Sequence, residues 1–417
     1  MAVNDFRQLD KVSLGEYIKA TPCLSSKLSN KVDDMQIQAV DEGLMNFVYI
    51  VKSSGGSMVI KQALPYIRSM GESMPQSKER AKYEAKALQV YASLCPSHVP
   101  QLYHFDPWLS LIAIKYLEPP HILLTKGLIA GIQYPLLAES ISEFFTRVFF
   151  HSSLLYTSQH DHERAVAEFY GNVEMIKLME QLTFCPFEES EYNSWTSPQL
   201  DLDVKAVQED DAIKLQVAQL KSIFCEKTQA LIHGDFHAGS VMVTQNSVQV
   251  IDPEFAFYGP MGYDIGTFFR NLIVSFFAQD GLATHQNDRQ NYKTWLLETL
   301  EKTWTLFELK FIKLWVEHND CSAAAEVILQ KKYMEDVFQD ALGFCAAYLI
   351  ASVIRVCTME EFECIDNVSK KAECERNTLN FGRMLLTERS KFKSIGQVVS
   401  SLKQYMLQYP SSFRSRC

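Results

Sequence analysis

Apolar and polar residues alternate in the first third of the chain with the period of β-strands, in short runs separated by turn residues. A helical pattern at 13–20 precedes these runs, and another at 78–94 lies between the third and fourth. The β content is therefore concentrated at the front of the chain. We predict strands at 35–40, 47–51, 58–62, 99–105 and 110–116.

Beyond the fifth strand the apolar positions recur at the spacing of amphipathic helices, with one predicted hairpin near 241–251. The acidic stretch 201–211 is expected to be a solvated loop or a helix start. We predict an α+β fold of two lobes, with a small β-rich lobe at 1–118 and a large, mostly helical lobe at 119–417. Helices are expected at 134–155, 160–181, 211–229, 261–277, 290–316, 331–357 and 370–386.

The composition narrows the class of protein. The chain has 417 residues, of which 47% are hydrophobic and 22% charged, so it can bury a large core. Its net charge of −10 argues against nucleic acid or an anionic membrane as a partner and favours a small-molecule substrate. The ten scattered cysteines form no CxxC pair, and we see neither a signal peptide nor a membrane span. We expect a cytoplasmic protein with reduced thiols.

The stretch LIHGDFHAGS at 231–240 carries the most informative chemistry. It reads as a strand end, a polar turn that presents Asp235, and the start of a hairpin, beyond which Asp252 and Glu254 follow. In kinases one carboxylate on such a loop accepts the proton of a hydroxyl, and another holds Mg²⁺. A single acidic residue near a hairpin is more often only a solvated turn residue. The two acidic sites in this order favour the kinase interpretation, with Asp235 as the base.

Residues of the small lobe fit the same interpretation. Lys61 follows Val59-Ile60 in a predicted strand, where kinases place the lysine that contacts the α- and β-phosphates of ATP. Its partner should be a glutamate on the next helix, which Ser77 can cap. Glu84 lies nearer the apolar stripe of that helix than Glu79 does, so we favour Glu84.

The turns and the connector of the small lobe are also candidates for nucleotide contacts. The turn at 41–46 occupies the place of a phosphate-covering loop, and it contributes Gly43 and Asn46. The connector at 116–120 contains Glu118 and two prolines, which make it stiff. A hinge of this kind offers backbone groups to adenine, although a plain linker would look the same.

Five strings of residues closely resemble the methylthioribose kinase family, within the aminoglycoside-phosphotransferase-like branch of protein-kinase-like folds. The resemblance covers nearly the whole chain, and its last two strings are the most specific. It implies an ATP-dependent transfer of the γ-phosphoryl group to 5-methylthioribose, giving the 1-phosphate, in methionine salvage. It also implies a bilobal fold, Mg²⁺ and a homodimer. The strings lie at 116–121, 126–135, 164–169, 233–245 and 252–266.

The resemblance assigns roles residue by residue. Asp235 would be the base toward the anomeric hydroxyl, and Asp252 with Glu254 would form a DxE metal site. Ser240 stands where related kinases carry Asn, so metal binding would rest on the DxE pair. His233 would brace the loop, and His237 would either pack the loop or contact phosphate.

The chain departs from the family pattern at two places. Paired arginines that grip the substrate hydroxyls are expected where this chain has Ala351-Ser352, with Arg355 one turn later. A tryptophan expected after the lysine strand is replaced by Met74. We take His237, Arg355 and Met74 as candidate substrate residues, and Arg355 or Arg270 as possible replacements for the missing arginines.

Two other functions remain open from the sequence. A paralogue with the same chemistry on another hydroxyl compound would explain the departures at 351–352 and 74. A pseudokinase that only binds a partner is the other alternative. The sequence speaks against it, because a module that only binds a partner has no need to keep all four polar side chains of the kinase interpretation. This chain has all four: Lys61, Asp235, Asp252 and Glu254.

Overall fold

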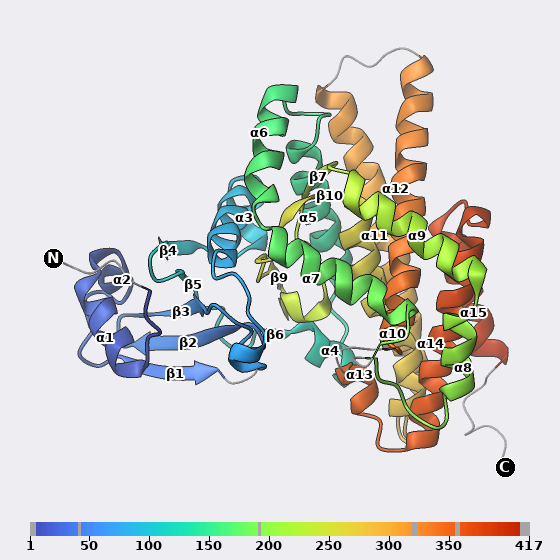
Figure 1. The fold of residues 1–417 in the computed structure, drawn as a ribbon, viewed down its shortest axis with the longest axis horizontal. Coiled ribbons are helices and arrows are strands. Elements are labelled where there is room, and N and C mark those ends of the chain that lie inside the picture. Colours follow the sequence, from blue (N-terminus) through green and yellow to red (C-terminus); the bar gives the residue numbers. More distant parts are fainter. Residues whose placement is uncertain (1–5, 41–42, 191–192, 319–323, 355–358, 409–417) are drawn as a thin grey trace.

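The structure is a computed structural model that describes residues 6–40, 43–190, 193–318, 324–354 and 359–408. A small lobe built around one sheet lies beside a larger helical lobe (Figure 1). This arrangement confirms the predicted α+β bilobal fold. The predicted boundary at 118 and 119, which falls between β5 and β6, stays a prediction. No helix among the described residues is both long and apolar enough to cross a membrane.

The small lobe contains an antiparallel sheet in the order β1-β2-β3-β5-β4. Each strand lies within three residues of the run that predicted it, because the alternation of apolar and polar positions is a direct consequence of the pleat. The strands are β1 (Gln36–Val40), β2 (Asn46–Ser53), β3 (Gly56–Ala63), β4 (Leu102–Asp106) and β5 (Leu111–Lys115).

The two faces of this sheet have different partners. One face packs on α1 (Lys11–Ala20) and α2 (Pro22–Lys27), and Met58 and Ile60 of β3 belong to that core. The other face meets α3 (Arg80–Leu94), and Ile112 of β5 is in its core. Because Lys61 pairs directly with Ile112 across the two strands, its side chain lies on the α3 face.

The large lobe is a bundle around α10, most of whose side chains are buried. This helix packs on α12 and α14, and α11 packs on α5. Such a helix reads as apolar all round because neighbours cover every side of it. The helices are α4 (Leu124–Ala130), α5 (Leu137–Ser152), α6 (Gln159–Tyr170), α7 (Val173–Phe184), α8 (Asp201–Gln208), α9 (Asp211–Glu226), α10 (Met261–Leu282), α11 (Gln290–His318), α12 (Ala324–Ala351), α13 (Glu360–Glu363), α14 (Val368–Glu388) and α15 (Ile395–Gln408).

Short strands in the large lobe position the polar loops. The predicted hairpin is present as β8 and β9, and β6 pairs with β8 to make a three-stranded sheet. A second pair joins β7 to β10. The β8–β9 and β7–β10 pairs bring the loop after β7 next to the segment after β9. These strands are β6 (Ile122–Leu123), β7 (Ala230–Ile232), β8 (Val241–Thr244), β9 (Ser247–Val250) and β10 (Phe257–Gly259).

Several predicted helices differ from those observed. The helix predicted at 160–181 is two helices, α6 and α7, because the chain breaks at Gly171 and Asn172. The stretch 201–211, expected to be a solvated loop or a helix start, is a helix start: α8 begins at Asp201, and α9 begins at Asp211. The helix after β3 begins at Arg80, and Ser77 does not cap it: the Ser77 hydroxyl accepts a 3.2 Å bond from the backbone N–H of Glu79, before the first turn. Helix α15 was not predicted.

Candidate active site

The ammonium of Lys61 is held between two carboxylates. Its Nζ lies 2.7 Å from Oε1 of Glu84 on α3, and it also contacts Oδ1 of Asp252 beyond β9. Lys61 and Glu84 are both buried, whereas Glu79 is exposed. The structure thus pairs Lys61 with Glu84, the glutamate on the apolar side of the helix.

Opposing effects set the charges of this pair. Burial alone would lower the pKa of Lys61, but the carboxylates of Asp252 and Glu84 beside it raise that pKa above its ordinary value. Burial raises the pKa of Glu84 to about 8, against the attraction of Lys61 and with the repulsion of Asp252 and Glu254. Lys61 therefore stays protonated, and the acidic groups of Glu84, Asp252 and Glu254 lie close enough to repel one another.

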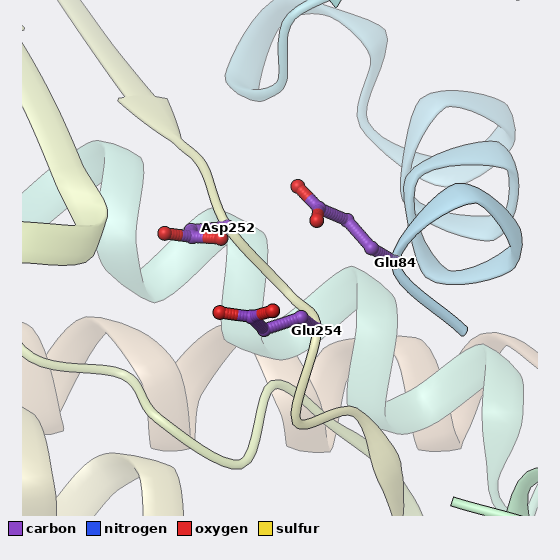
Figure 2. Close-up of side chains that lie close together, drawn as sticks. All are labelled: Glu84, Asp252 and Glu254. Atoms are coloured by element: carbon purple, nitrogen blue, oxygen red, sulfur yellow. The ribbon is translucent and has the colours of Figure 1, made fainter. Parts of the chain in front are cut away.

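Three carboxylates meet between the lobes. Oxygen atoms of Glu84, Asp252 and Glu254 lie within 4.8 Å of one another, and Figure 2 shows Glu84 reaching from α3 toward the segment that carries the other two. Oxygen ligands of this kind suit a hard divalent cation such as Mg²⁺. Burial, with the charge of Asp252, also raises the pKa of Glu254. A divalent cation would relieve this crowding, so the donor set fits one.

The backbone that presents these carboxylates is strained. Asp252 has φ +68°, in the left-handed region that residues other than glycine rarely occupy. Such a conformation costs about 1–3 kcal/mol and persists only where the surroundings hold it. Asn172, at the break between α6 and α7, helps to hold this backbone in place. Its Nδ2 donates to the backbone carbonyls of Glu254, at 2.9 Å, and Ala256, at 3.2 Å. The helix break therefore supports the acidic segment.

Arg80 is a part of the site that the sequence analysis missed. The side chain is fully buried at the start of α3, and its Nε lies 3.2 Å from Oε2 of Glu254. Asn46 donates to the same oxygen at 2.8 Å and accepts from Arg80 at 3.0 Å. Arg80 and Asn46 both contact Oε2 of Glu254, which leaves Oε1 as the oxygen that can face a cation. A signal was present, because Arg80 lies four residues before Glu84 and so on the same side of the helix.

The remaining bonds of Arg80 join three segments. Nη1 donates to the carbonyls of Leu64 after β3, at 2.8 Å, and of Ser77, at 2.7 Å. Nη2 donates to the carbonyl of Met45 at 3.0 Å. Arg80 thus ties the turn before β2 to the acidic segment of the large lobe.

Asp235 lies on a loop that other buried groups fix. The carboxylate of Asp264, at the start of α10, accepts the backbone N–H groups of His233 (2.6 Å) and Gly234 (3.0 Å). Gly234 has φ +81°, and a Cβ there would lie 2.3 Å from the carbonyl oxygen of Phe255, so no other residue fits. Burial raises the pKa of Asp264 to about 7, although the two N–H bonds oppose it.

His233 links the Asp235 loop to the strand before Asp252. Its Nδ1 accepts the backbone N–H of Asp235 at 3.2 Å, so Nε2 carries the proton and donates to the carbonyl of Ile251 at 2.9 Å. Burial lowers the pKa of His233, which keeps the ring neutral. This is a bracing role, and it holds the two acidic segments in register.

The imidazole of His237 lies against the carboxylate of Asp235. Nε2 of His237 lies 3.3 Å from Oδ2 of Asp235, while Nδ1 accepts the backbone N–H of Gly239 at 2.9 Å. Burial would raise the pKa of Asp235, but the charge of His237 and its hydrogen bond lower it below its ordinary value. Asp235 is therefore ionised at neutral pH, as a proton acceptor must be. Burial would lower the pKa of His237, and Asp235 raises it.

The other predicted site residues lie at varying positions. The Ser240 hydroxyl donates to the carbonyl of Asp235 at 2.9 Å, so it braces the loop. Glu118 is exposed in the connector and accepts from the Ser57 hydroxyl at 2.7 Å. Gly43 is half-buried in the turn before β2, and Met74 is exposed in the loop before α3. The nucleotide and substrate roles of all four stay predictions.

Arg355 lies outside the described residues. Ser352 is buried, and its hydroxyl donates to the carbonyl of Tyr348 at 2.7 Å. A serine carries no charge, so it does not replace the expected arginine. Arg270 of α10 is buried with its guanidinium over the ring of Tyr348, 5.6 Å from the centroid.

One family model and several solved structures match this chain. A model of a phosphotransferase enzyme family matches residues 161–295, which include the Asp235 loop and the DxE segment. Among solved structures, a choline kinase from Cryptosporidium parvum Iowa II is 12% identical with a TM-score of 0.46, over 94% of this chain and 99% of that one.

Two curated relatives match almost from end to end. The chain is 51% identical over 412 residues to methylthioribose kinase 1 of Oryza sativa subsp. japonica, covering 96% of each protein. It is 33% identical over 410 residues to the methylthioribose kinase of Escherichia coli O45:K1 (strain S88 / ExPEC), covering 95% of this chain and 98% of the relative. The chain belongs to the methylthioribose kinase family.

Proposed function

We propose that this chain is an ATP-dependent kinase that transfers the γ-phosphoryl group to a hydroxyl of 5-methylthioribose. The observation that carries the proposal is the convergence of Lys61 and the three carboxylates with a loop that presents an ionised Asp235. Phosphoryl transfer needs these groups and little covalent chemistry, because positioning and charge neutralisation supply most of the acceleration. The names of the relatives supply the acceptor.

Each residue then has a defined task. Lys61, fixed by Glu84, contacts the phosphates of ATP. The turn that contains Gly43, with Asn46 at the start of β2, covers them. Asp235 accepts the proton of the attacking hydroxyl, which contributes about 10²- to 10⁴-fold to the rate. Asp252 and Glu254 would hold Mg²⁺, which would neutralise charge on the phosphates when bound.

One observation favours a second acceptor. Ala351 and Ser352 stand where the family resemblance predicts two cations, and the hydroxyl of Ser352 is bonded to the carbonyl of Tyr348 in α12. A related hydroxyl compound is therefore the alternative substrate. The same kinase chemistry would act on it, with the same residues in the phosphate half of the site.

ATP consumption measured against a panel of acceptors tests the proposal. The panel contains 5-methylthioribose, thio-, deoxy- and ordinary pentoses, and small alcohols, amines and phenols. Turnover of 5-methylthioribose above all others is the expected result, and turnover confined to another hydroxyl compound would select the alternative. Binding of a protein partner independent of nucleotide, with no ATP consumed for any acceptor, would identify a pseudokinase instead.

Three further properties belong to the same proposal. A cytoplasmic location agrees with the seven described cysteines, all of which are free thiols. The homodimer rests on the family resemblance alone, and sedimentation of the purified chain would test it. A neutral sugar as substrate agrees with the net charge of −10, which gives no reason to expect nucleic acid.

A further inference from the structure

Arg270 differs from the other buried cations of the protein. Four lysine or arginine side chains are buried among the described residues, and three of them contact carboxylates: Lys61, Arg80 and Lys293. Arg270 is 9% exposed, and within the described part of the chain no carboxylate lies at ion-pair distance from it. Its Nε is buried and has no hydrogen-bond partner there. Burying a guanidinium without such partners is costly, so its presence calls for a ligand.

Arg270 makes two weak contacts, which hold its guanidinium in place. The guanidinium carbon lies 5.6 Å from the ring centroid of Tyr348, as in a cation–π contact, and Nη1 lies 3.6 Å from the Met359 sulfur. The Tyr348 hydroxyl is already bonded to Tyr263 at 2.5 Å and to Thr183 at 3.0 Å. Tyr348 therefore offers Arg270 a ring face and no acceptor oxygen, and the weak sulfur acceptor does not replace one.

Arg270 lies on the helix that fixes the Asp235 loop, because Asp264 at the start of the same helix accepts the backbone N–H groups of His233 and Gly234. Its charge acts on Asp235, on His237 and on Glu361, lowering the pKa of Asp235 and opposing the rise that burial gives Glu361. Glu361 lies on α13, which packs on α10, and its side chain is 2% exposed. Arg270 thus lies near the loop that carries Asp235, the base of the proposed function, and Glu361 lies near Arg270 on the neighbouring helix.

We propose that Arg270 is the acceptor-binding cation of this chain, and that it donates two hydrogen bonds to adjacent hydroxyls of a small neutral polyol. The inference rests on the proposed function, and it moves the cation from residues 351 and 352, at the end of α12, to Arg270 on α10. A guanidinium presents several N–H donors in a fixed fork, which suits two neighbouring oxygens. An anionic ligand fits less well, because Asp235 and Glu361 would face it.

The test uses Arg270→Gln and Arg270→Lys in the full chain, with Lys293→Gln as the matched control. Lys293 is also a buried cation against α10, but Asp280 pairs with it at 2.7 Å. Arg270→Gln should raise KM for 5-methylthioribose roughly 10- to 100-fold, the effect of losing a hydrogen bond to a charged group, and leave KM for ATP unchanged. Arg270→Lys should recover part of this loss. Lys293→Gln should lower Tm without changing either KM, and equal acceptor KM values in Arg270→Gln and the control would overturn the proposal.

Deoxy acceptors identify the hydroxyls. In the wild type, 2-deoxy and 3-deoxy forms of 5-methylthioribose should each bind more weakly than the parent. In Arg270→Gln the same deletions should have little further effect, because the interaction is already lost. Equal losses in both proteins would show that Arg270 does not contact these hydroxyls.

Calorimetry separates this inference from the proposed kinase activity. Should the wild type turn over no acceptor, the kinase proposal fails, and binding of 5-methylthioribose is then compared directly. Binding that Arg270→Gln loses would still support the assigned site. Binding that is equal in both proteins, or absent in the wild type, would overturn it.

Discussion

The Nε of Arg80 lies 3.2 Å from Oε2 of Glu254, and both side chains are buried where the two lobes meet. Arg80 begins α3 of the small lobe, and Glu254 follows β9 in the large lobe. The pair thus fixes the acidic segment against the helix that also carries Glu84. Because Arg80 also donates to the carbonyl of Met45, it links the turn before β2 to the segment that carries Glu254.

Breaking this pair should destabilise the protein more than breaking a surface pair of the same helix. Arg80→Met leaves Glu254 buried without its cation, which typically costs about 3–5 kcal/mol. Lys86→Met, on the same helix, removes an exposed pair with Glu168 and should cost less than about 1 kcal/mol. Urea unfolding of both variants measures the difference. Similar losses would show that the Arg80 contacts contribute little.

Mg²⁺ should stabilise the wild type in the absence of nucleotide. A ligand that binds only the folded state raises Tm with its concentration. Asp252→Asn and Glu254→Gln each remove a ligand charge, so both should abolish most of this rise in a thermal-shift titration. Glu79→Gln is the control, because Glu79 is an exposed acid at the start of the same helix as Glu84. A rise that survives both site substitutions would place the metal elsewhere.

Asp264 should make stability depend on pH. Burial raises its pKa from 3.8 to about 7 in the folded protein, so the folded state keeps a proton that the unfolded chain releases near 3.8. The contribution of this group to stability therefore falls as pH rises from 3.8 to about 7 and is constant above that. Asp264→Asn removes the titration. The unfolding free energy of the wild type minus that of the variant should therefore decrease as pH rises over this range. A difference that is constant with pH would mean that Asp264 is ionised throughout.

Local sequence pattern was enough to predict that Lys61 and Glu84 pair at the candidate site. Lys61 follows two β-branched residues in a strand, and its pairing with Ile112 places it on the α3 face, where the apolar stripe of the next helix had selected Glu84. The loop at 233–240 and the acids after β9 are joined by a hairpin, so their proximity follows from short-range connectivity.

Contacts between distant segments were beyond such reasoning. Arg80 resembles a solvent-facing arginine in the first turn of a helix, and its burial depends on carbonyls of Met45 and Leu64 that reach it only in the folded lobe. The break at Asn172 was missed because apolar spacing continues across it. Its amide instead supports the carbonyl of Glu254, 82 residues away in the chain.

Asp235→Asn should separate the chemical step from nucleotide binding. The variant keeps the size of the side chain and the fold of the loop, since Asp264 and His233 hold the backbone and not the carboxylate. It removes the proton acceptor, so kcat should fall about 10²- to 10⁴-fold. ATP affinity by calorimetry should stay the same, because Lys61 and the DxE pair are intact. Asp201→Asn, an acid on α8 bonded to the Trp195 indole, should change neither quantity. A loss of ATP affinity as large as the loss in kcat would assign Asp235 to the nucleotide and leave the attacking hydroxyl without its base.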